Sequence, residues 1–511
     1  PLAEYRIANV KTSSTDKDAS SAFLKYEDFS HYADYFNGME DENIVQAIPN
    51  AKASEWMEEN IPLFECPQRN FEEMYYYRWW SLRKHIKETP VGYGMTEFLI
   101  QRSYSDKYNL IACAIGHHIY ESRWLRDPKY LDQIIHTWYR GNDGGPMKKM
   151  DKFSSWNADA ILARYMVDGD KDFMLDMAKD LETEYQRWER TNRLKNGLYW
   201  QGDVQDGMEE SISGGRKKKY ARPTINSYMY GNAKALSLMG ILSGNEGMAM
   251  KYGMRADTLK SLVENDLWNT RHQFFETVRI DSSANVREAI GYIPWYFNLP
   301  DTTKKYEVAW KEIMDEKGFS APYGLTTAER RHPEFRTRGV GKCEWDGAIW
   351  PFASAQTLTA MANFMNNYPQ TVLSDSVYFR QMELYVESQY HRGRPYIGEY
   401  LDEVTGYWLK GDQERSRYYN HSTFNDLIIT GLVGLRPRAD HTVEVNPLLP
   451  DGRWDWFCLD NLLYHGHYLT ILWDKYGDRY HRGKGLLVLV DGKIVGQSDT
   501  LERIVCKDVL E

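Results

Sequence analysis

Most of the chain carries hydrophobic residues at intervals of three and four positions, the repeat expected of α-helices that bury one face. The pattern starts near residue 52 and recurs, with interruptions, to about residue 435. Its clearest stretch contains Phe71, Met74, Tyr75, Arg78, Trp79, Leu82 and Ile86. Further stretches run over residues 108–119, 173–188, 358–365 and 377–388. The spacing therefore predicts a largely helical body over residues 52–435.

Short polar turns separate several of these predicted helices. Asp168-Gly169-Asp170 and Ser243-Gly244-Asn245 each place a glycine where one helix would end and an Asp or Asn where the next would begin. Repeated helical hairpins are typical of an α-solenoid or a closed toroid. We find no fixed repeat period, and the hairpins are joined by long, unequal, aromatic-rich segments. These features favour a toroid whose loops gather around a pocket at one end.

The two ends of the chain have a different pattern. After residue 435, β-rich runs such as 468–473 and 486–495 appear, and Asp491-Gly492 is a strong signal for a two-residue hairpin turn. Residues 436–511 are therefore predicted to form a small antiparallel, sandwich-like β appendage. Residues 1–51 are polar and irregular. We expect them to form an extended or β arm that packs on the body.

Composition narrows the possible partners. The 511 residues are 42% apolar, enough for a folded core, and the net charge of −10 argues against nucleic acid as a partner. No segment approaches the roughly 20 apolar residues that span a bilayer.

The five cysteines contain no CxxC pair, so neither a zinc site nor a disulfide framework is expected. We expect a monomer or small homo-oligomer, periplasmic or secreted after loss of a leader, with a cytoplasmic location still open.

Two separated carboxylate segments suggest the chemistry. The first, Asp206-Gly207-Met208-Glu209-Glu210-Ser211, lies among tryptophans and tyrosines, and its acids are flanked by apolar side chains that would raise a carboxyl pKa. The second surrounds Glu399, in a loop rich in arginine, glycine and proline. Glycoside hydrolysis requires two such groups, because one protonates the leaving oxygen and the other activates water or attacks the sugar.

Aromatic residues supply a second indication of a sugar ligand. The chain contains 17 Trp and 37 Tyr, several of them in glycine-flanked segments beside acids. Aromatic rings can stack on the C–H face of a sugar while neighbouring polar groups bond its hydroxyls. Core packing is the alternative, and it is the stronger one for Trp79, which lies in a helical stripe. Our candidates for sugar contact are Arg78, Trp79, Trp156, Trp200, Gln201, Arg222, Tyr228, Trp345 and Trp350.

Three motifs together resemble those of a known clan. The stretch 345–351, Trp-Asp-Gly-Ala-Ile-Trp-Pro, matches a pocket-lining Trp-x-Gly-x-x-Trp-Pro sequence. The acidic segment resembles a Ser-Gly-x-Asp-x-Ser general-acid motif with Glu209 at the acid position, and Glu399 to Gly406 resembles the general-base motif with Glu403 in place of a proline. The layout resembles the six-hairpin (α/α)6 glycoside hydrolases of the trehalase and family 63 glucosidase clan, especially the bacterial branch similar to mannosylglycerate hydrolase.

This resemblance covers roughly residues 52–510 and implies an exo-acting, inverting hydrolase of an α-glucoside or α-mannoside. Glu209 would be the general acid, with Asp206 in reserve, and Glu399 the general base. No metal and no cofactor are implied. A polysaccharide lyase, using a Tyr or His base on a uronic acid, is the rival enzyme class. A non-catalytic glycan-binding protein is the third possibility.

Overall fold

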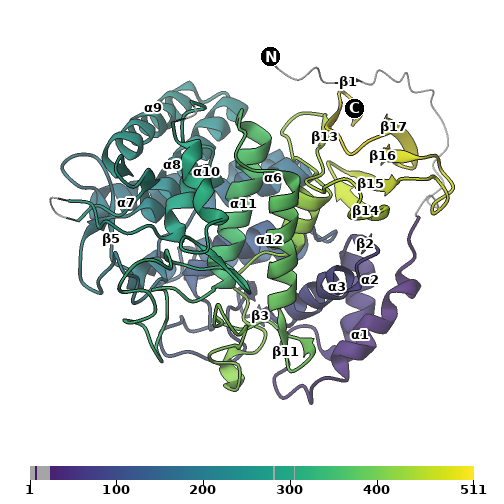
Figure 1. The fold of residues 1–511 in the computed structure, drawn as a ribbon, viewed down its shortest axis with the longest axis horizontal. Coiled ribbons are helices and arrows are strands. Elements are labelled where there is room, and N and C mark those ends of the chain that lie inside the picture. The colour runs from purple at the N-terminus through teal and green to yellow at the C-terminus, as the bar shows by residue number, and fades with distance from the viewer. Residues whose placement is uncertain (1–5, 8–22, 280–281, 304, 511) are drawn as a thin grey trace.

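The computed structural model describes residues 6–7, 23–279, 282–303 and 305–510 (Figure 1). Helices make up most of the body. Their bounds are α1 (Ser30–Asn37), α2 (Ala53–Asn60), α3 (Arg69–Lys84), α4 (Ile115–Ser122), α5 (Lys129–Arg140), α6 (Asn157–Asp168), α7 (Lys171–Asn192), α8 (Pro223–Ser243), α9 (Glu246–Leu262), α10 (Ile293–Tyr296), α11 (Pro351–Asn367), α12 (Asp375–Ser388) and α13 (Asn425–Leu427). In the part of the chain that the structure describes, no helix is both long and apolar enough to cross a membrane.

The predicted helices over residues 71–86, 173–188, 358–365 and 377–388 are confirmed as α3, α7, α11 and α12, except that Ile86 begins strand β3 (Ile86–Thr89) instead of belonging to α3. Both predicted inter-helix turns are also confirmed. Gly169 ends α6 and Gly244 ends α8, each with a left-handed φ of 72°. Asp170 and Asn245 then cap α7 and α9 by accepting hydrogen bonds from backbone N–H groups three residues on.

The helix predicted over residues 108–119 starts later than its periodicity suggests. The described helix α4 begins at Ile115, and residues 106–110 form a turn instead. Asp106 accepts hydrogen bonds from the backbone N–H groups of Tyr108 and Leu110, both 2.8 Å long, and Asn109 adopts a left-handed φ of 67°. An aspartate side chain that bonds its own local backbone favours a turn over a helix, and it decides the conformation here.

The C-terminal region is a twisted antiparallel sheet in the order β17-β16-β15-β14-β2. Its strands are β14 (Trp456–Tyr464), β15 (His467–Asp474), β16 (Gly485–Val490) and β17 (Lys493–Ser498), completed by β2 (Leu63–Glu65) from the helical body. Asp491 and Gly492, both with positive φ, form the tight turn between β16 and β17, as predicted. The antiparallel C-terminal β region is thus confirmed, and β2 fastens it to the helices.

A second, three-stranded sheet joins β13 (Val443–Val445) and β18 (Ile504–Cys506) to β1 (Arg6–Ile7), which pairs with β18 in parallel. Residues 1–5 and 8–22 of the predicted arm lie outside the described residues. Residues 30–37, for which we expected extended or β structure, form helix α1 instead.

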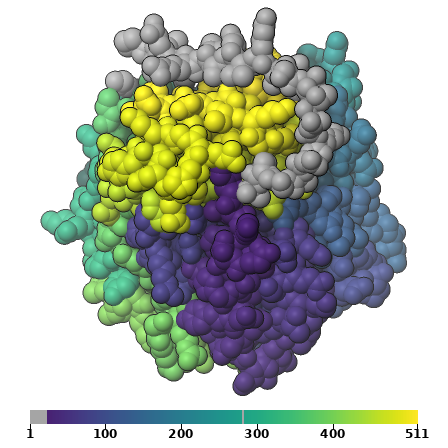
Figure 2. Space-filling view, turned by 90° about the vertical axis from the view of Figure 1, so that its right-hand side faces the viewer, coloured from purple at the N-terminus to yellow at the C-terminus, as the bar shows by residue number. Residues whose placement is uncertain are grey.

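Helix α1 forms because Tyr32 and Phe36, four residues apart, share one face and can pack together on α3. Tyr32 stacks on Tyr76 with ring centroids 5.1 Å apart, and Phe36 meets Tyr77 edge-on at 5.3 Å. Figure 2 shows the C-terminal sheet region in yellow directly adjoining the purple N-terminal helices. The N-terminal segment therefore covers one face of α3.

Several short hairpins project between the helices. They are β3 (Ile86–Thr89) with β4 (Gly92–Met95), β5 (Trp200–Gln201) with β6 (Tyr220–Ala221), β7 (Trp268–Asn269) with β8 (Phe274–Phe275), β9 (Ser320–Ala321) with β10 (Gly324–Leu325), and β11 (Tyr390–His391) with β12 (Arg394–Pro395). The two predicted carboxylate segments are attached to them. The acidic segment lies between β5 and β6, and Glu399 follows β12 by four residues.

Candidate active site

Glu209 is held by a sharply turned loop between β5 and β6. A single 3-10 turn, Val204–Asp206, ends at Gly207, whose left-handed φ of 73° only glycine adopts readily. The following Met208 is buried and its N–H bonds the carbonyl of Asp203 at 2.9 Å. Glu210 again has a positive φ, 70°. Two left-handed residues thus bracket the pair 208–209, so Met208 is turned into the core and Glu209 is left partly buried beside it.

The other two carboxylates of this segment are already paired. Asp206 is fully buried and forms an ion pair with the equally buried Arg222, 2.7 Å between Oδ2 and Nε. It also accepts hydrogen bonds from the hydroxyls of Ser154 and Thr224. Glu210 pairs with Arg216 at 2.9 Å. Within the described residues no cation pairs with Glu209, so it alone of the three carboxyls has no counter-ion.

Glu399 has the opposite surroundings. Its side chain is buried, yet Lys410 Nζ lies 3.4 Å from Oε1 and Arg415 Nη2 lies 3.6 Å from Oε2. Both cations come from the chain segment that follows Glu399, so the loop brings its own positive charges. Oε2 accepts no hydrogen bond from a described residue. Glu399 therefore has two cations beside it and one oxygen open to a further donor.

The electrostatic surroundings of Glu209 also set it apart from Glu399. Burial raises the pKa of Glu209 to about 7, and the negative charges of Asp203 and Glu399 raise it as well. Glu209 is therefore largely protonated just below neutral pH. Because the charge of Glu399 acts on it, the two carboxyl groups lie within electrostatic range of each other.

A third carboxyl, which the sequence analysis missed, belongs to the same group. Glu97 lies two residues after β4 and is 3% exposed. Its oxygens accept hydrogen bonds from Tyr419 Oη, 2.6 Å, and Cys113 Sγ, 3.2 Å. Burial raises the pKa of Glu97 to about 7, and the charges of Glu399 and Glu209 add to the effect. The sequence did not indicate Glu97 as a site residue, because Thr96-Glu97-Phe98 matches no motif.

An aromatic stack stands beside these acids. Trp345 lies on Trp350 with ring centroids 4.4 Å apart, and Trp350 lies on Tyr400 at 4.6 Å, with interplanar angles of 19° and 18°. Tyr400 directly follows Glu399, and Lys410 Nζ lies 4.9 Å from the centre of its ring. The indole nitrogens of Trp345 and Trp350 are buried and donate to no described residue. The stack therefore ends beside Glu399, and two of its rings have an indole N–H without a described acceptor.

A second aromatic group surrounds Phe352. Its ring meets His117 at 4.5 Å, His421 at 5.9 Å, Trp345 at 6.0 Å and Trp156 at 6.2 Å. Burial lowers the pKa of both histidines well below the usual value, so both rings are neutral. Their ring nitrogens have no described partner in good hydrogen-bonding geometry. Hydrogen-bonding groups without partners, gathered on an apolar floor, are what a sugar site requires.

Of the predicted sugar-site residues, the structure thus brings together Trp156, Trp345 and Trp350, with Tyr228 against Trp156 at 4.9 Å. Tyr228 accepts a hydrogen bond from Gln356 at 2.7 Å. Arg222, the partner of Asp206, has one further nitrogen, Nη2, that donates to no described residue.

The remaining candidates occupy other positions. Trp79 is wholly buried in the core, edge-on to Tyr75 at 6.1 Å, because its helical stripe faces inward. Arg78 donates to Gln389 at 2.8 Å and to the carbonyl of Ser422 at 2.6 Å, so it fastens α3 to the segment that carries His421. These contacts give both residues a structural role, and their contact with a sugar stays a prediction.

Trp200 and Gln201 lie on β5, at the base of the Glu209 loop. The ring of Trp200 is covered by Lys219 Nζ at 4.4 Å, and the buried Gln201 accepts a hydrogen bond from the N–H of Gly202 at 3.0 Å. The carbonyl of Trp200 also accepts a hydrogen bond from Asn192, the last residue of α7, at 3.0 Å.

Comparisons with known proteins identify the family of the chain. Residues 107–422 match the family model described as mannosylglycerate hydrolase MGH1-like glycoside hydrolase domain, and residues 435–496 match the C-terminal domain of glycosyl hydrolase family 65. The first match contains Glu209, Glu399 and the Trp345 stack.

Three solved structures illustrate the range of similarity. A protein named sialidase is 91% identical, with a TM-score of 0.95 over 98% of this chain, but this chain spans only 46% of its length. The GH63 mannosylglycerate hydrolase from Thermus thermophilus, in complex with glucose, is 13% identical, with a TM-score of 0.53 over 70% of this chain and 99% of its own. An alpha-L-rhamnosidase from Dictyoglumus thermophilum is 12% identical, with a TM-score of 0.52 over 86% of this chain and 45% of its own.

The last two likenesses concern the fold alone, whereas the family model covers more than half of the chain. The resemblance inferred from the three motifs is confirmed. The chain belongs to the mannosylglycerate hydrolase MGH1-like glycoside hydrolases.

Proposed function

We propose that the chain is an exo-acting, inverting glycoside hydrolase in which Glu209 is the general acid and Glu399 the general base. The observation that carries the proposal is the contrast between their surroundings. Glu209 has no counter-ion, and burial raises its pKa to about 7, whereas Glu399 lies between Lys410 and Arg415. Pairs of carboxyls whose environments drive their protonation apart are typical of acid and base partners.

In this mechanism Glu209 gives its proton to the glycosidic oxygen as the bond to the anomeric carbon breaks. Glu399 takes a proton from a water molecule, which attacks that carbon from the opposite side. The configuration is thereby inverted, the leaving sugar departs as an alcohol, and one proton is transferred by each carboxyl. An inverting pair leaves about 6.5–9.5 Å between the carboxyls for the water.

Asp206, the reserve acid, suits the role less well. Both of its oxygens are already engaged, one by the Ser154 hydroxyl and the other by Arg222 and the Thr224 hydroxyl, so neither is open to a glycosidic oxygen. We therefore assign it to the support of the loop that presents Glu209.

The architecture that we propose around this pair is an (α/α)6 toroid. Helical hairpins such as α6–α7 and α8–α9, with short turns at one end, supply the outer and inner helices of such a barrel. We propose residues 52–435 as the catalytic domain, 436–511 as the β appendage and 1–51 as the N-terminal arm. Buried carboxyls with enclosing aromatics suit a pocket that accepts the end of a glycan chain, and hence exo action.

The default substrate is a terminal α-glucoside or α-mannoside of an oligo- or polysaccharide. The name of the 91% identical protein adds sialosides to the compounds worth testing, although more than half of that protein lies outside the region similar to this chain. The rhamnosidase neighbour adds rhamnosides, and arabinosides belong with them because fold does not fix the sugar.

A panel of aryl glycosides and oligosaccharides covering these sugars, followed by NMR of the first-formed anomer, tests the proposal. We expect release of one sugar with inversion. Glu209→Gln and Glu399→Gln should each lower kcat on an unactivated oligosaccharide by at least about 100-fold. Glu210→Gln is the matched control, because its carboxylate is adjacent in sequence but paired with Arg216, and it should keep near-normal activity.

Other outcomes would replace the proposal. Retention of configuration would contradict the inverting pair. Absorbance from a newly formed double bond, with no water incorporated, would indicate a lyase. Sugar binding without turnover, unchanged in both Gln variants, would indicate a glycan-binding protein.

A further inference from the structure

Glu97 is built into the site more firmly than a chance neighbour would be. Each of its two oxygens accepts one hydrogen bond, from Tyr419 Oη at 2.6 Å and from Cys113 Sγ at 3.2 Å. Its backbone carbonyl accepts a third, from the N–H of Asn420 at 2.9 Å. Side chain and backbone of one residue thus fasten the segment 419–420, which leads directly into His421.

Cys113 connects Glu97 to the loop of the proposed acid. A Cβ atom built on Gly207 would lie 3.5 Å from the Cβ of Cys113, so the thiol side chain rests against the turn that orients Glu209. Glu97 therefore lies at a junction, with the Glu209 loop on one side, reached through Cys113, and the His421 segment on the other, reached through Tyr419.

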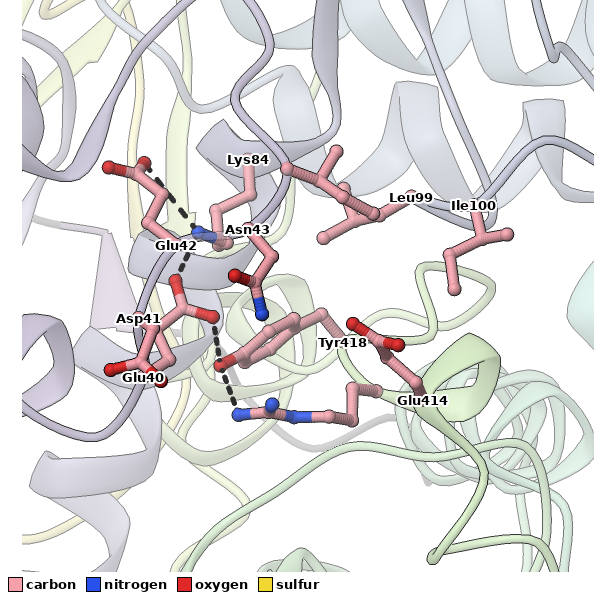
Figure 3. Close-up of a pocket in the computed structure, with 11 residues that line it drawn as sticks. Glu40, Asp41, Glu42, Asn43, Lys84, Leu99, Ile100, Glu414 and Tyr418 are labelled. Carbon is pink, nitrogen blue, oxygen red and sulfur yellow. Dashed lines mark hydrogen bonds and ion pairs between the residues drawn. The ribbon is translucent and has the colours of Figure 1, made fainter.

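The segment is anchored a second time, through Tyr418. Figure 3 shows Tyr418 and Lys84 both directed to Glu40, which follows helix α1. The Tyr418 hydroxyl donates to Glu40 at 2.6 Å, and Lys84 Nζ lies 5.5 Å from the centre of the Tyr418 ring. Neighbouring tyrosines 418 and 419 thus each bond a buried carboxyl, one outside the site and one inside it. This pairing supplies a natural control.

The ionisable groups that face Glu97 are mostly acidic or neutral. The charges of Glu209 and Glu399 disfavour its ionisation, and burial does so more strongly, so that the pKa of Glu97 is raised to about 7. The charge of Glu97 in turn raises the pKa of Tyr104, Tyr419 and Cys113. Lys152 is the cation on this side, and it interacts with Cys113 and Glu209. Arg102 faces Tyr104, and His421 is neutral.

We propose that Glu97 is a positioning residue of the active site, which joins the Glu209 loop to the His421 segment and, when ionised, helps Glu209 to keep its proton. The inference rests on the proposed role of Glu209. Interaction between charges is reciprocal, so a negative charge on Glu97 disfavours a second negative charge on Glu209. As pH rises through neutrality, ionisation of Glu97 delays ionisation of the acid, and activity extends to higher pH than Glu209 alone would allow.

The test is the pH dependence of kcat/KM for Glu97→Gln, measured on a substrate whose leaving group needs protonation. Glutamine keeps an acceptor for Tyr419 but never becomes charged. We expect the alkaline limb to move to lower pH by about one unit, the size expected for loss of one nearby charge. Thermal unfolding and circular dichroism at each pH verify that the variant is folded. Tyr419→Phe, which removes one bond to Glu97 but leaves the carboxyl, should lower kcat with a smaller movement of the limb.

Glu40→Gln is the matched control, because it alters the equivalent bond to Tyr418 outside the site. It should lower thermal stability and leave the alkaline limb in place. An unchanged limb in Glu97→Gln, or an equal movement in Glu40→Gln, would overturn the inference. Full activity in Glu209→Gln would instead overturn the proposed function, so the two failures are distinguishable.

Discussion

Asp206 and Glu209, three residues apart in one loop, should affect stability in opposite directions when each is neutralised. Asp206→Asn removes the charge that pairs with a fully buried Arg222. Glu209→Gln removes a carboxyl whose charged form burial disfavours and which forms no ion pair with a described cation. The first change should therefore destabilise the fold and the second should stabilise it at alkaline pH.

The magnitudes follow from the surroundings. Removing one partner of a buried ion pair costs about 3–5 kcal/mol, because the other charge stays buried without compensation. For Glu209 the pKa is 4.5 in an unperturbed chain and about 7 in the fold, and each pKa unit corresponds to about 1.4 kcal/mol. A group whose pKa is raised on folding binds more protons in the native state. Its ionisation therefore costs stability progressively from pH 4.5 to 7, by up to about 3 kcal/mol above pH 7.

Differential scanning calorimetry at pH 8 and pH 4.5 measures both effects. With about 2.1 cal/mol/K of unfolding entropy per residue, a chain of 511 residues shifts its Tm by about 1 °C for each kcal/mol. Asp206→Asn should lower the Tm by about 3–5 °C. Glu209→Gln should raise it by up to about 3 °C at pH 8 and have little effect at pH 4.5. A Tm that falls in Glu209→Gln at pH 8, or that stays constant in Asp206→Asn, would refute the assignment of the two carboxyls.

Four further results are expected. Glu209→Gln should lose far less activity on a dinitrophenyl glycoside than on an oligosaccharide, because that leaving group departs without a proton; equal losses would contradict a role as acid. The kcat/KM of the wild type on the oligosaccharide should fall as pH rises above about 7, as Glu209 loses its proton; a profile flat to pH 9 would contradict this. Lys410→Met should lower kcat/KM by roughly 10-fold or more, since a hydrogen bond to the charged Glu399 contributes about 1.5–3 kcal/mol, whereas an unchanged value would show that this cation is dispensable. Gly207→Ala should cost about 1 kcal/mol and lower kcat, because an alanine there is strained at a φ of 73° although Cys113 leaves it room; normal kcat would show that the turn does not orient the acid.

The elements that the sequence predicted well are those fixed by local physics. The stripe in α7 repeats every three to four residues from 173 to 188, and a glycine ends the preceding helix, so periodicity and capping agree. The Asp491-Gly492 turn requires two residues that tolerate positive φ, and few other pairs do so. Near residue 108 apolar spacing indicated a helix, but one carboxylate, Asp106, bonds the backbone of Tyr108 and Leu110 into a turn.

The site was predictable only in part, for a physical reason. Motifs locate residues that are close in sequence, such as Glu209 within its loop or Trp345 and Trp350. Glu97 and Tyr419 are 322 residues apart and come together only in the fold, so no sequence spacing predicts their contact. For Trp79 the helical stripe favoured core packing over sugar contact, and its side chain is indeed wholly buried.

The division of roles between the two proposed catalytic carboxyls depends on where the cations lie. Lys410 and Arg415 follow Glu399 closely in sequence, so the base carries its counter-ions on its own loop. The buried cation attached to the Glu209 loop is Arg222, and its charge is compensated by Asp206, with Glu288 and Asp203 also acting on it. Asp206 therefore does more than support the turn. By neutralising Arg222 it leaves the acid three residues away among negative neighbours, where a proton is retained.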